Sequence, residues 1–255
     1  MKFNISKFSG EFKNTIDWML RGTYAQKVID DLQHIQNNKI LIEKDHNSVE
    51  ALKFIIVAIR TNSWRLKKPE GLDSGIDSFV SKYNDEFRTS SAIEDLIALV
   101  GNRRKKNIDQ LLAYPTLKDF TDKLYDLAKK GKTEVLGEKG RDNYLRDFGH
   151  WDRIPIDRHE MRFIIRTGIY HACSRNEKSD HLEKSDLQDA LTRFCTKFLN
   201  GYQVQAIELG NAAGIVDVFI WSFSAEDRYN ICGATPKCKK CNLIRVCLYA
   251  LTNLA

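Results

Sequence analysis

The cysteines of this 255-residue chain are unevenly placed. Two of the six stand alone, and four share the C-terminal tail: Cys232, Cys238, Cys241 and Cys247. In an oxidising compartment such a cluster would form disulfides, whereas in a reducing one four thiolates would bind a metal centre. The opening residues, MKFNISKFSG, have no apolar run after their first lysine, so we expect no secretory signal and favour metal binding.

A lysine and an aspartate upstream of the tail form a second set with chemical potential. Lys139 follows a glycine-containing turn, and Asp157 precedes an apolar helical pattern eighteen residues later. A neutral lysine amine can attack an electrophilic carbon and form a Schiff base, and a carboxylate can stabilise a developing cation. Taken singly, Lys139 is a helix-end surface lysine and Asp157 a helix N-cap.

Helices are predicted to position these residues. Apolar side chains recur at helical spacing in three amphipathic stretches and one stretch that is apolar on almost every side, and these cover 117–128, 161–172, 187–199 and 48–59. Expected caps are Thr116 for the first stretch, a Ser185–Gln188 capping box for the third, and Asn47 with Glu50 for the buried helix. Since no useful strand alternation occurs, the predicted fold class is all-α.

The region around Lys139 is predicted to form a helix–hairpin–helix. One amphipathic helix ends at Lys130-Gly131, a turn covers 132–140, and a second helix runs to about Phe148. Gly137 and Gly140 would allow another chain to approach closely, or adopt positive φ where the turn needs it. Amides at the start of the second helix would bind a phosphate. An ordinary αα-hairpin is the alternative.

The run Lys139-Gly-Arg-Asp-Asn-Tyr-Leu-Arg-Asp-Phe-Gly149, followed by Ile156-Asp157-Arg158-His159, resembles the helix–hairpin–helix DNA glycosylase superfamily. That family has a hairpin near L-x-G-x-G, then a helix, a loop and a [VI]-D-x-H signature. This segment is most similar to the archaeal-type 8-oxoguanine glycosylase/lyases. The cysteine tail, with Pro236 before its C-x2-C core, instead resembles the iron–sulfur loop of the endonuclease III and adenine-glycosylase branch. Two departures are that Val135 takes the hairpin's first glycine position and that the first cysteine gap is one residue short.

The resemblance implies a bifunctional DNA repair glycosylase/AP lyase. Lys139 would be the nucleophile and Asp157 the electrostatic partner, and an oxidised base such as 8-oxoguanine would be the favoured target. One alternative is a monofunctional glycosylase for mismatched thymine, uracil or adenine, in which Asp157 acts with water. Another is a non-catalytic module that binds damaged DNA.

The resemblance also implies a [4Fe–4S] cluster on the four tail cysteines. Zinc ribbons usually present two C-x2-C pairs, and this tail has one, so we favour the cluster over zinc and over unliganded thiols. Lys239 and Lys240 project from the same loop and would contact DNA phosphates. Gly137, Gly140 and Arg141 of the hairpin would do so as well, and Arg60, in Ala58-Ile59-Arg60-Thr61-Asn62, would probe the gap left by a flipped base.

Composition bounds the remaining expectations. A net charge of +6 suits a polyanionic partner, here double-stranded DNA with a damaged or mismatched base. Hydrophobic residues make up 42% of the chain, which excludes a disordered protein, and no apolar run reaches the roughly 20 residues of a membrane span. We expect a cytoplasmic, nucleoid-associated monomer. It would have an N-terminal segment 1–47 packed on the C-terminal lobe, a helical domain 48–156 with the helix–hairpin–helix at about 117–148, and a lobe 157–255 with the cluster loop at 232–247.

Overall fold

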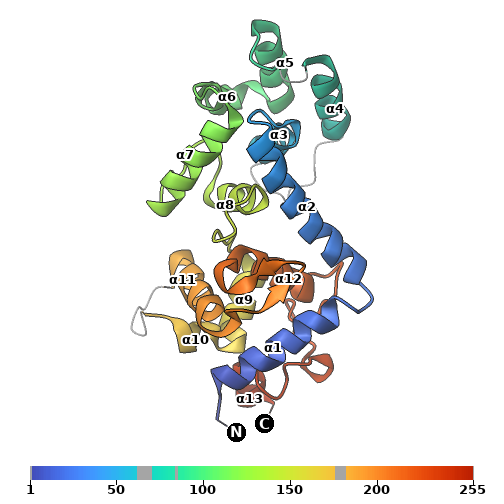
Figure 1. Ribbon diagram of the computed structural model, residues 1–255, viewed down its shortest axis with the longest axis vertical. Helices are drawn as coiled ribbons and strands as arrows, with labels where there is room; N and C mark the ends of the chain where they lie inside the picture. The colour runs from blue at the N-terminus through green and yellow to red at the C-terminus, as the bar shows by residue number, and fades with distance from the viewer. Residues whose placement is uncertain (1, 62–70, 84–85, 176–181, 255) are drawn as a thin grey trace. The chain divides into compact units, whose positions relative to one another are not determined.

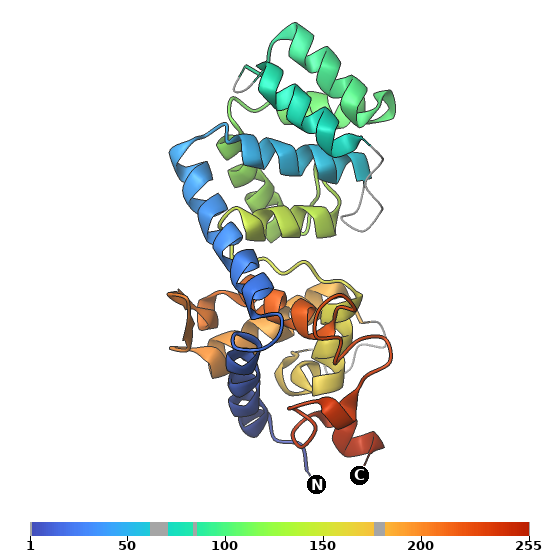
Figure 2. The same cartoon turned by 90° about the vertical axis from the view of Figure 1, so that its right-hand side faces the viewer.

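A computed structural model describes residues 2–61, 71–83, 86–175 and 182–254 (Figures 1 and 2). Within these residues the chain is mostly helical, so the predicted all-α fold class is confirmed. The strands described are β1 (Gln203–Val204) and β2 (Ile207–Glu208), which pair antiparallel over two residues each. None of the described helices is long and apolar enough to cross a membrane.

The chain divides into two compact units. Unit 1 contains residues 1–33 and 151–255, and unit 2 contains residues 34–150. The boundaries expected at 47 and 156 therefore fall at 33 and 150, and the first lies inside a helix, α2 (Ala25–Lys44). A continuous helix gives no composition change at its midpoint, which is why sequence inspection placed that boundary at the following loop instead.

Unit 2 is built around the buried helix expected at 48–59 (Figure 1). Its Phe54 meets Tyr144 and Phe148 edge to face, with ring centroids 5.4 and 5.8 Å apart, which fixes this helix against the hairpin's second helix. In chain order the helices of unit 2 are α3 (Val49–Thr61), α4 (Leu72–Tyr83), α5 (Ser90–Val100), the short η1 (Asn102–Arg104), α6 (Lys105–Leu112), α7 (Leu117–Lys129) and α8 (Glu138–Asp147).

The caps in unit 2 agree with expectation at α7 but not at α3. Thr116 caps α7 in a full capping box with Asp119, as the sequence predicts for its N-cap. Asn47 does not cap its own helix: its Oδ1 accepts a hydrogen bond from the N–H of Leu117, 3.2 Å away. The loop before α3 thus satisfies the first amide of α7, a contact between segments 70 residues apart that no local pattern reveals.

Unit 1 is centred on α9 (Arg158–Thr167), which packs against neighbours from both ends of the chain (Figures 1 and 2). The N-terminal helix joins this core through Phe12, whose ring lies 5.5 Å from that of Phe163 and 5.9 Å from that of Phe194. The helices are α1 (Ile5–Met19), α9 (Arg158–Thr167), α10 (Ile169–Cys173), α11 (Lys184–Phe194), the π-helical η2 (Cys195–Leu199), the short η3 (Leu209–Asn211), α12 (Ala213–Ser224), the short η4 (Cys238–Lys240) and α13 (Leu248–Asn253).

The helix predicted at 161–172 is interrupted. Gly168 adopts a left-handed conformation, with φ of +89°, and ends α9, so the apolar stripe does not continue in phase. Ala172, beyond this break, is exposed although it was expected in the core. Ile165 is exposed as well, because α9 itself buries the face that contains Phe163 and Ile164. The glycine was visible in the sequence, but an apolar run on both sides of it hid its role as a helix end.

The stretch at 187–199 is helical and buried as predicted, with two local differences. Its capping box pairs Glu183 with Asp186, so the box begins two residues before the Ser185–Gln188 box that we expected. Its last turn, from Cys195, widens into the π-helix η2, a change of hydrogen-bond register that side-chain periodicity does not encode.

Candidate functional site

The helix, turn and helix predicted around Lys139 are present as α7, a turn over 130–137, and α8. Gly131 turns the chain with φ of +67° after α7, and Gly137 is the N-cap of α8. Glycine has no side chain with which to cap, so the first amides of α8 have no side-chain acceptor at the N-cap. Lys139 lies in this first turn and is half-buried. The turn therefore places Lys139 at the start of a helix whose N-cap residue makes no side-chain hydrogen bond to the helix amides.

Positive φ angles in the hairpin occur at Gly131 and Val135, not at Gly137 or Gly140 as the sequence allowed. Val135 has φ of +62°, and the N–H of Leu136 donates to the carbonyl of Glu134 across it. This three-residue turn is a strained conformation for a β-branched residue. The side-chain amide of Asn107 in α6 donates to the carbonyl of Val135 at 2.8 Å and so holds the strained turn in place.

Arg141 does not lie on a DNA-facing surface, and this expectation was wrong. Only 1% of the residue is exposed, its Nε and Nη2 donate to the carboxylate of Asp142, and its Nη1 donates to the carbonyl of Lys132 at 2.6 Å. A buried arginine with its charge matched in this way cannot also bind a phosphate. Its contact with Lys132 instead ties the start of the turn to α8.

Asp157 occupies the N-cap of α9, as the sequence indicates. Its Oδ1 accepts from the N–H of His159 at 2.6 Å, and Glu160 completes the box by accepting from the N–H of Asp157 at 2.9 Å. An ionised carboxylate is favoured at a helix N-terminus because the helix dipole is positive there. The cap therefore holds the carboxylate of Asp157 in one orientation at the start of α9.

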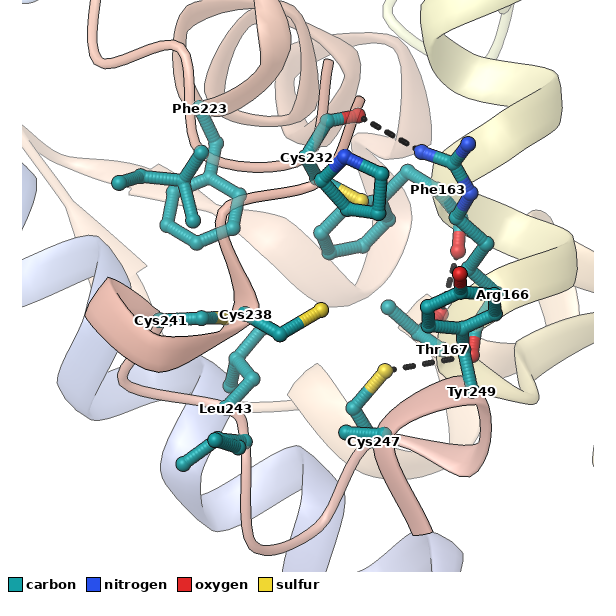
Figure 3. A pocket seen from close by; sticks show the side chains of 14 residues that line it. Phe163, Arg166, Thr167, Phe223, Cys232, Cys238, Cys241, Leu243, Cys247 and Tyr249 are labelled. Carbon is teal, nitrogen blue, oxygen red and sulfur yellow. Dashed lines mark hydrogen bonds between the residues drawn. The ribbon is translucent and has the colours of Figure 1, made fainter. Parts of the chain in front are cut away.

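The four tail cysteines converge on one cavity in unit 1 (Figure 3). The cavity has an empty volume of about 360 Å³, its open side included, and its other walls are largely apolar, with Phe163, Phe223 and Leu243 among them. Cys232 and Cys247 are buried, and Cys238 and Cys241 are half-buried. No group of three or more His, Cys, Asp or Glu side chains in the described ranges is drawn together tightly enough to hold a single metal ion. The thiols are instead arranged around a space.

This donor set fits a cluster with four thiolate ligands. Burial raises the pKa of Cys232 to about 11 and that of Cys241 to about 12, and burial also raises the pKa of Cys247. Thiols in such an apolar wall stay protonated by themselves and release their protons when they bind a metal centre. The surrounding tail consists of tight turns with little regular structure, so ligation would add stability that its own packing does not supply.

Arg166, in the last turn of α9, joins that helix to the cysteine loop (Figure 3). Its Nη1 donates to the carbonyls of Cys232 and Gly233, at 3.4 and 2.6 Å, and its Nη2 donates to the carbonyl of Ala234 at 3.1 Å. The Sγ of Cys247 donates to the backbone carbonyl of Arg166 at 3.2 Å. Sequence inspection missed this residue, because nothing in its spacing from the cysteines marks it.

The remaining predicted DNA contacts are dispersed. Lys239 and Lys240 lie on η4 and are exposed. Arg60 lies in the last turn of α3, half-buried, and donates to the carbonyl of Val100 at 3.5 Å, which places its charge at the C-terminal end of α5. The segment that would follow it, from Asn62, lies outside the described residues.

The structure brings together the four cysteines, and it places the two candidate catalytic residues in separate units. Lys139 belongs to unit 2 and Asp157 to unit 1, so each is described within its own unit. Comparisons with protein-family models, with characterised proteins and with solved structures find no match for this chain. The case for a function therefore depends on the residues themselves and on the motifs that they form.

Proposed function

We propose that this protein is a bifunctional DNA glycosylase/AP lyase that excises a damaged base, with an oxidised base such as 8-oxoguanine favoured. The observation that carries the proposal is that each of the two candidate residues lies at the start of a helix. Lys139 lies in the first turn of α8, the helix that follows the hairpin turn. Asp157 caps α9, the next helix, which a short loop separates from α8. These are the positions at which the superfamily that this sequence resembles has its nucleophile and its catalytic aspartate.

The proposed reaction begins with extrusion of the target nucleotide, because a base inside a duplex is inaccessible. The Nζ of Lys139 attacks C1′ of the sugar, and the bond between C1′ and the base breaks as the base departs with the bonding electrons. Asp157 is ionised as the base departs and stabilises the positive charge that develops on the sugar. It then relays the proton that the amine loses to the departing base, and so ends ionised. Ring opening then gives a Schiff base.

Strand cleavage follows from the same covalent intermediate. The Schiff base makes the C2′ proton acidic, and its removal expels the 3′ phosphate by β-elimination. Water then hydrolyses the imine and releases Lys139. The hairpin would contribute by binding the DNA backbone: the exposed Gly137, at the positive end of the α8 dipole, would let a phosphate of the same strand approach the start of the helix.

The four tail cysteines would hold a [4Fe–4S] cluster, which would supply structural stability by cross-linking the tail. Arg166 would hold the loop in the conformation that brings these thiols together, and its positive charge would offset the negative charge of the ligated site. Lys239 and Lys240 would contact DNA phosphates from the same loop. Such an enzyme would act as a monomer on chromosomal DNA, at the nucleoid of the cytoplasm.

Borohydride trapping on a panel of duplexes tests the proposal. The panel carries 8-oxoguanine, an oxidised pyrimidine, uracil, or a mismatched adenine or thymine, and only a Schiff base leaves a covalent protein–DNA adduct. We expect trapping and strand cleavage with at least one oxidised base, and loss of both in Lys139→Gln. Excision without trapping would instead identify a monofunctional glycosylase, and binding without excision of any base would identify a DNA-binding module.

A further inference from the structure

Four consecutive cations at the start of α6 have no ion-pair partner among the described residues. Arg103 and Arg104 close η1, and Lys105 and Lys106 begin α6, whose first turn carries no acidic side chain. Three of the four are exposed and Arg104 is half-buried, and none of them forms an ion pair in the described part of the chain.

This arrangement is unfavourable in the protein alone. Positive side chains are disfavoured at a helix N-terminus because the helix dipole is positive there, and adjacent like charges add repulsion. Other lysines of unit 2 are neutralised by nearby carboxylates, as in the pairs Lys82–Asp95, Lys118–Asp122 and Lys129–Asp126. The start of α6 is therefore a place where a bound anion would relieve repulsion that the rest of the unit avoids.

Asn107 connects this cluster to the hairpin. It follows Lys106 directly in the first turn of α6, and its side chain donates to the carbonyl of Val135 in the hairpin's strained turn. On the other side of the same turn Lys130 and Lys132 are exposed and form no ion pair among the described residues. Since Arg141 fixes the carbonyl of Lys132, both ends of the turn are anchored. We call these side chains the basic surface: Arg103, Arg104, Lys105, Lys106, Lys130 and Lys132.

We infer that the basic surface binds the sugar–phosphate backbone of duplex DNA and adds phosphate contacts to those that the hairpin makes. The inference rests on the proposed function, in which the hairpin holds the damaged strand. A polyanion with spaced charges fits better than a single phosphate, because the six cations come from η1, α6 and the hairpin turn and five of them are exposed. Such contacts position the protein and carry no base specificity.

The test compares two double variants with equal change in net charge. Lys105→Gln with Lys106→Gln removes two cations of the basic surface, and Lys118→Gln with Lys129→Gln removes two paired lysines from α7. The dissociation constant for an undamaged duplex is measured by fluorescence anisotropy over a range of salt concentrations. Each phosphate contact contributes about −0.9 to the log–log slope, so the first variant should lose about 1.8 of slope. If the wild type and this variant bind DNA equally at 1 M salt, the variant should bind about 60-fold more weakly than the wild type at 0.1 M salt.

The control variant should keep the slope of the wild type. An unchanged slope in Lys105→Gln/Lys106→Gln, or an equal loss in the control, would overturn the inference. Single-turnover excision at saturating enzyme separates this result from the proposed function. If the slope falls but no base in the panel is excised, the surface binds DNA and the proposed chemistry is wrong. If excision proceeds and the salt slope of Lys105→Gln/Lys106→Gln is unchanged, the proposed chemistry is supported and another surface binds the DNA.

Discussion

Substitution of Asp157 separates catalysis from helix capping. Asp157→Asn keeps an oxygen that can accept from the N–H of His159, so the cap should survive. Loss of the carboxylate charge at the start of α9 costs about 0.3–1 kcal/mol of stability through the helix dipole. Asp157→Ala also removes the acceptor, and loss of an N-cap costs about 0.5–2 kcal/mol. By contrast, removing one preorganised electrostatic partner from a transition state lowers a rate about 10²–10³-fold, or about 2.7–4 kcal/mol.

The assay is single-turnover excision with saturating enzyme, paired with thermal unfolding of each variant. We expect Asp157→Asn to lose excision by about 10²–10³-fold with little change in unfolding, and Asp157→Ala to lose both. Glu160→Gln is the matched control, since its amide oxygen can still accept from the N–H of Asp157 and complete the box. Excision that survives in Asp157→Asn, or unfolding of that variant, would mean that Asp157 is only a cap and that the active site lies elsewhere.

Three further outcomes are expected. Purified protein should be brown and contain about four iron and four sulfide per chain, and Cys241→Ala should lose iron and unfold at lower temperature; zinc in stoichiometric amount without iron would contradict this. Gly137→Ala should leave stability unchanged, because Gly137 has φ of −65° and open space at its β-position, but should weaken DNA binding; equal affinity would exclude a close backbone contact there. Arg166→Met removes three hydrogen bonds to the cysteine loop and should reduce iron content, measured per chain, with Arg166→Lys intermediate; full iron occupancy in Arg166→Met would show that the loop forms without it.

Local sequence patterns predicted the helices well where one buried face continues without interruption. The stretch from Leu117 and the buried run from Val49 appear as α7 and α3 with nearly the expected bounds. The pattern failed at Gly168, where apolar residues continue across a left-handed glycine and the buried face changes phase. It also failed for Asn47, whose acceptor serves another helix. Local periodicity reports burial on one helix, and it carries no information about hydrogen bonds between distant segments.

The candidate site was predictable to the extent that its chemistry is local. The four cysteines lie close together in the sequence, and they line one cavity. Asp157 directly precedes a helical pattern, and it is the N-cap of that helix. Arg166 lies 66 residues from the first carbonyl that it binds, so no motif could reveal it. Arg141 was misassigned for a related reason: its charge suggested an exposed position, and the partner that buries it, the carbonyl of Lys132, is a backbone group with no sequence signal.

Helix α9 links the candidate catalytic residue to the cysteine loop. Its first residue follows Asp157, and its last turn presents Arg166 to three consecutive carbonyls of the loop. Where α9 ends, a β-carbon on Gly168 would come within 2.6 Å of the ring of Phe3 and 3.0 Å of Leu248, so segments from both chain termini pack at this point. A ligated tail would therefore fix one end of the helix whose other end orients Asp157. A metal centre there, though it would take no part in the proposed chemistry, would thus have a physical means of affecting the proposed excision. Loss of the loop's structure would free the C-terminal end of α9, and the orientation of the aspartate would become less well defined without any change at Asp157 itself.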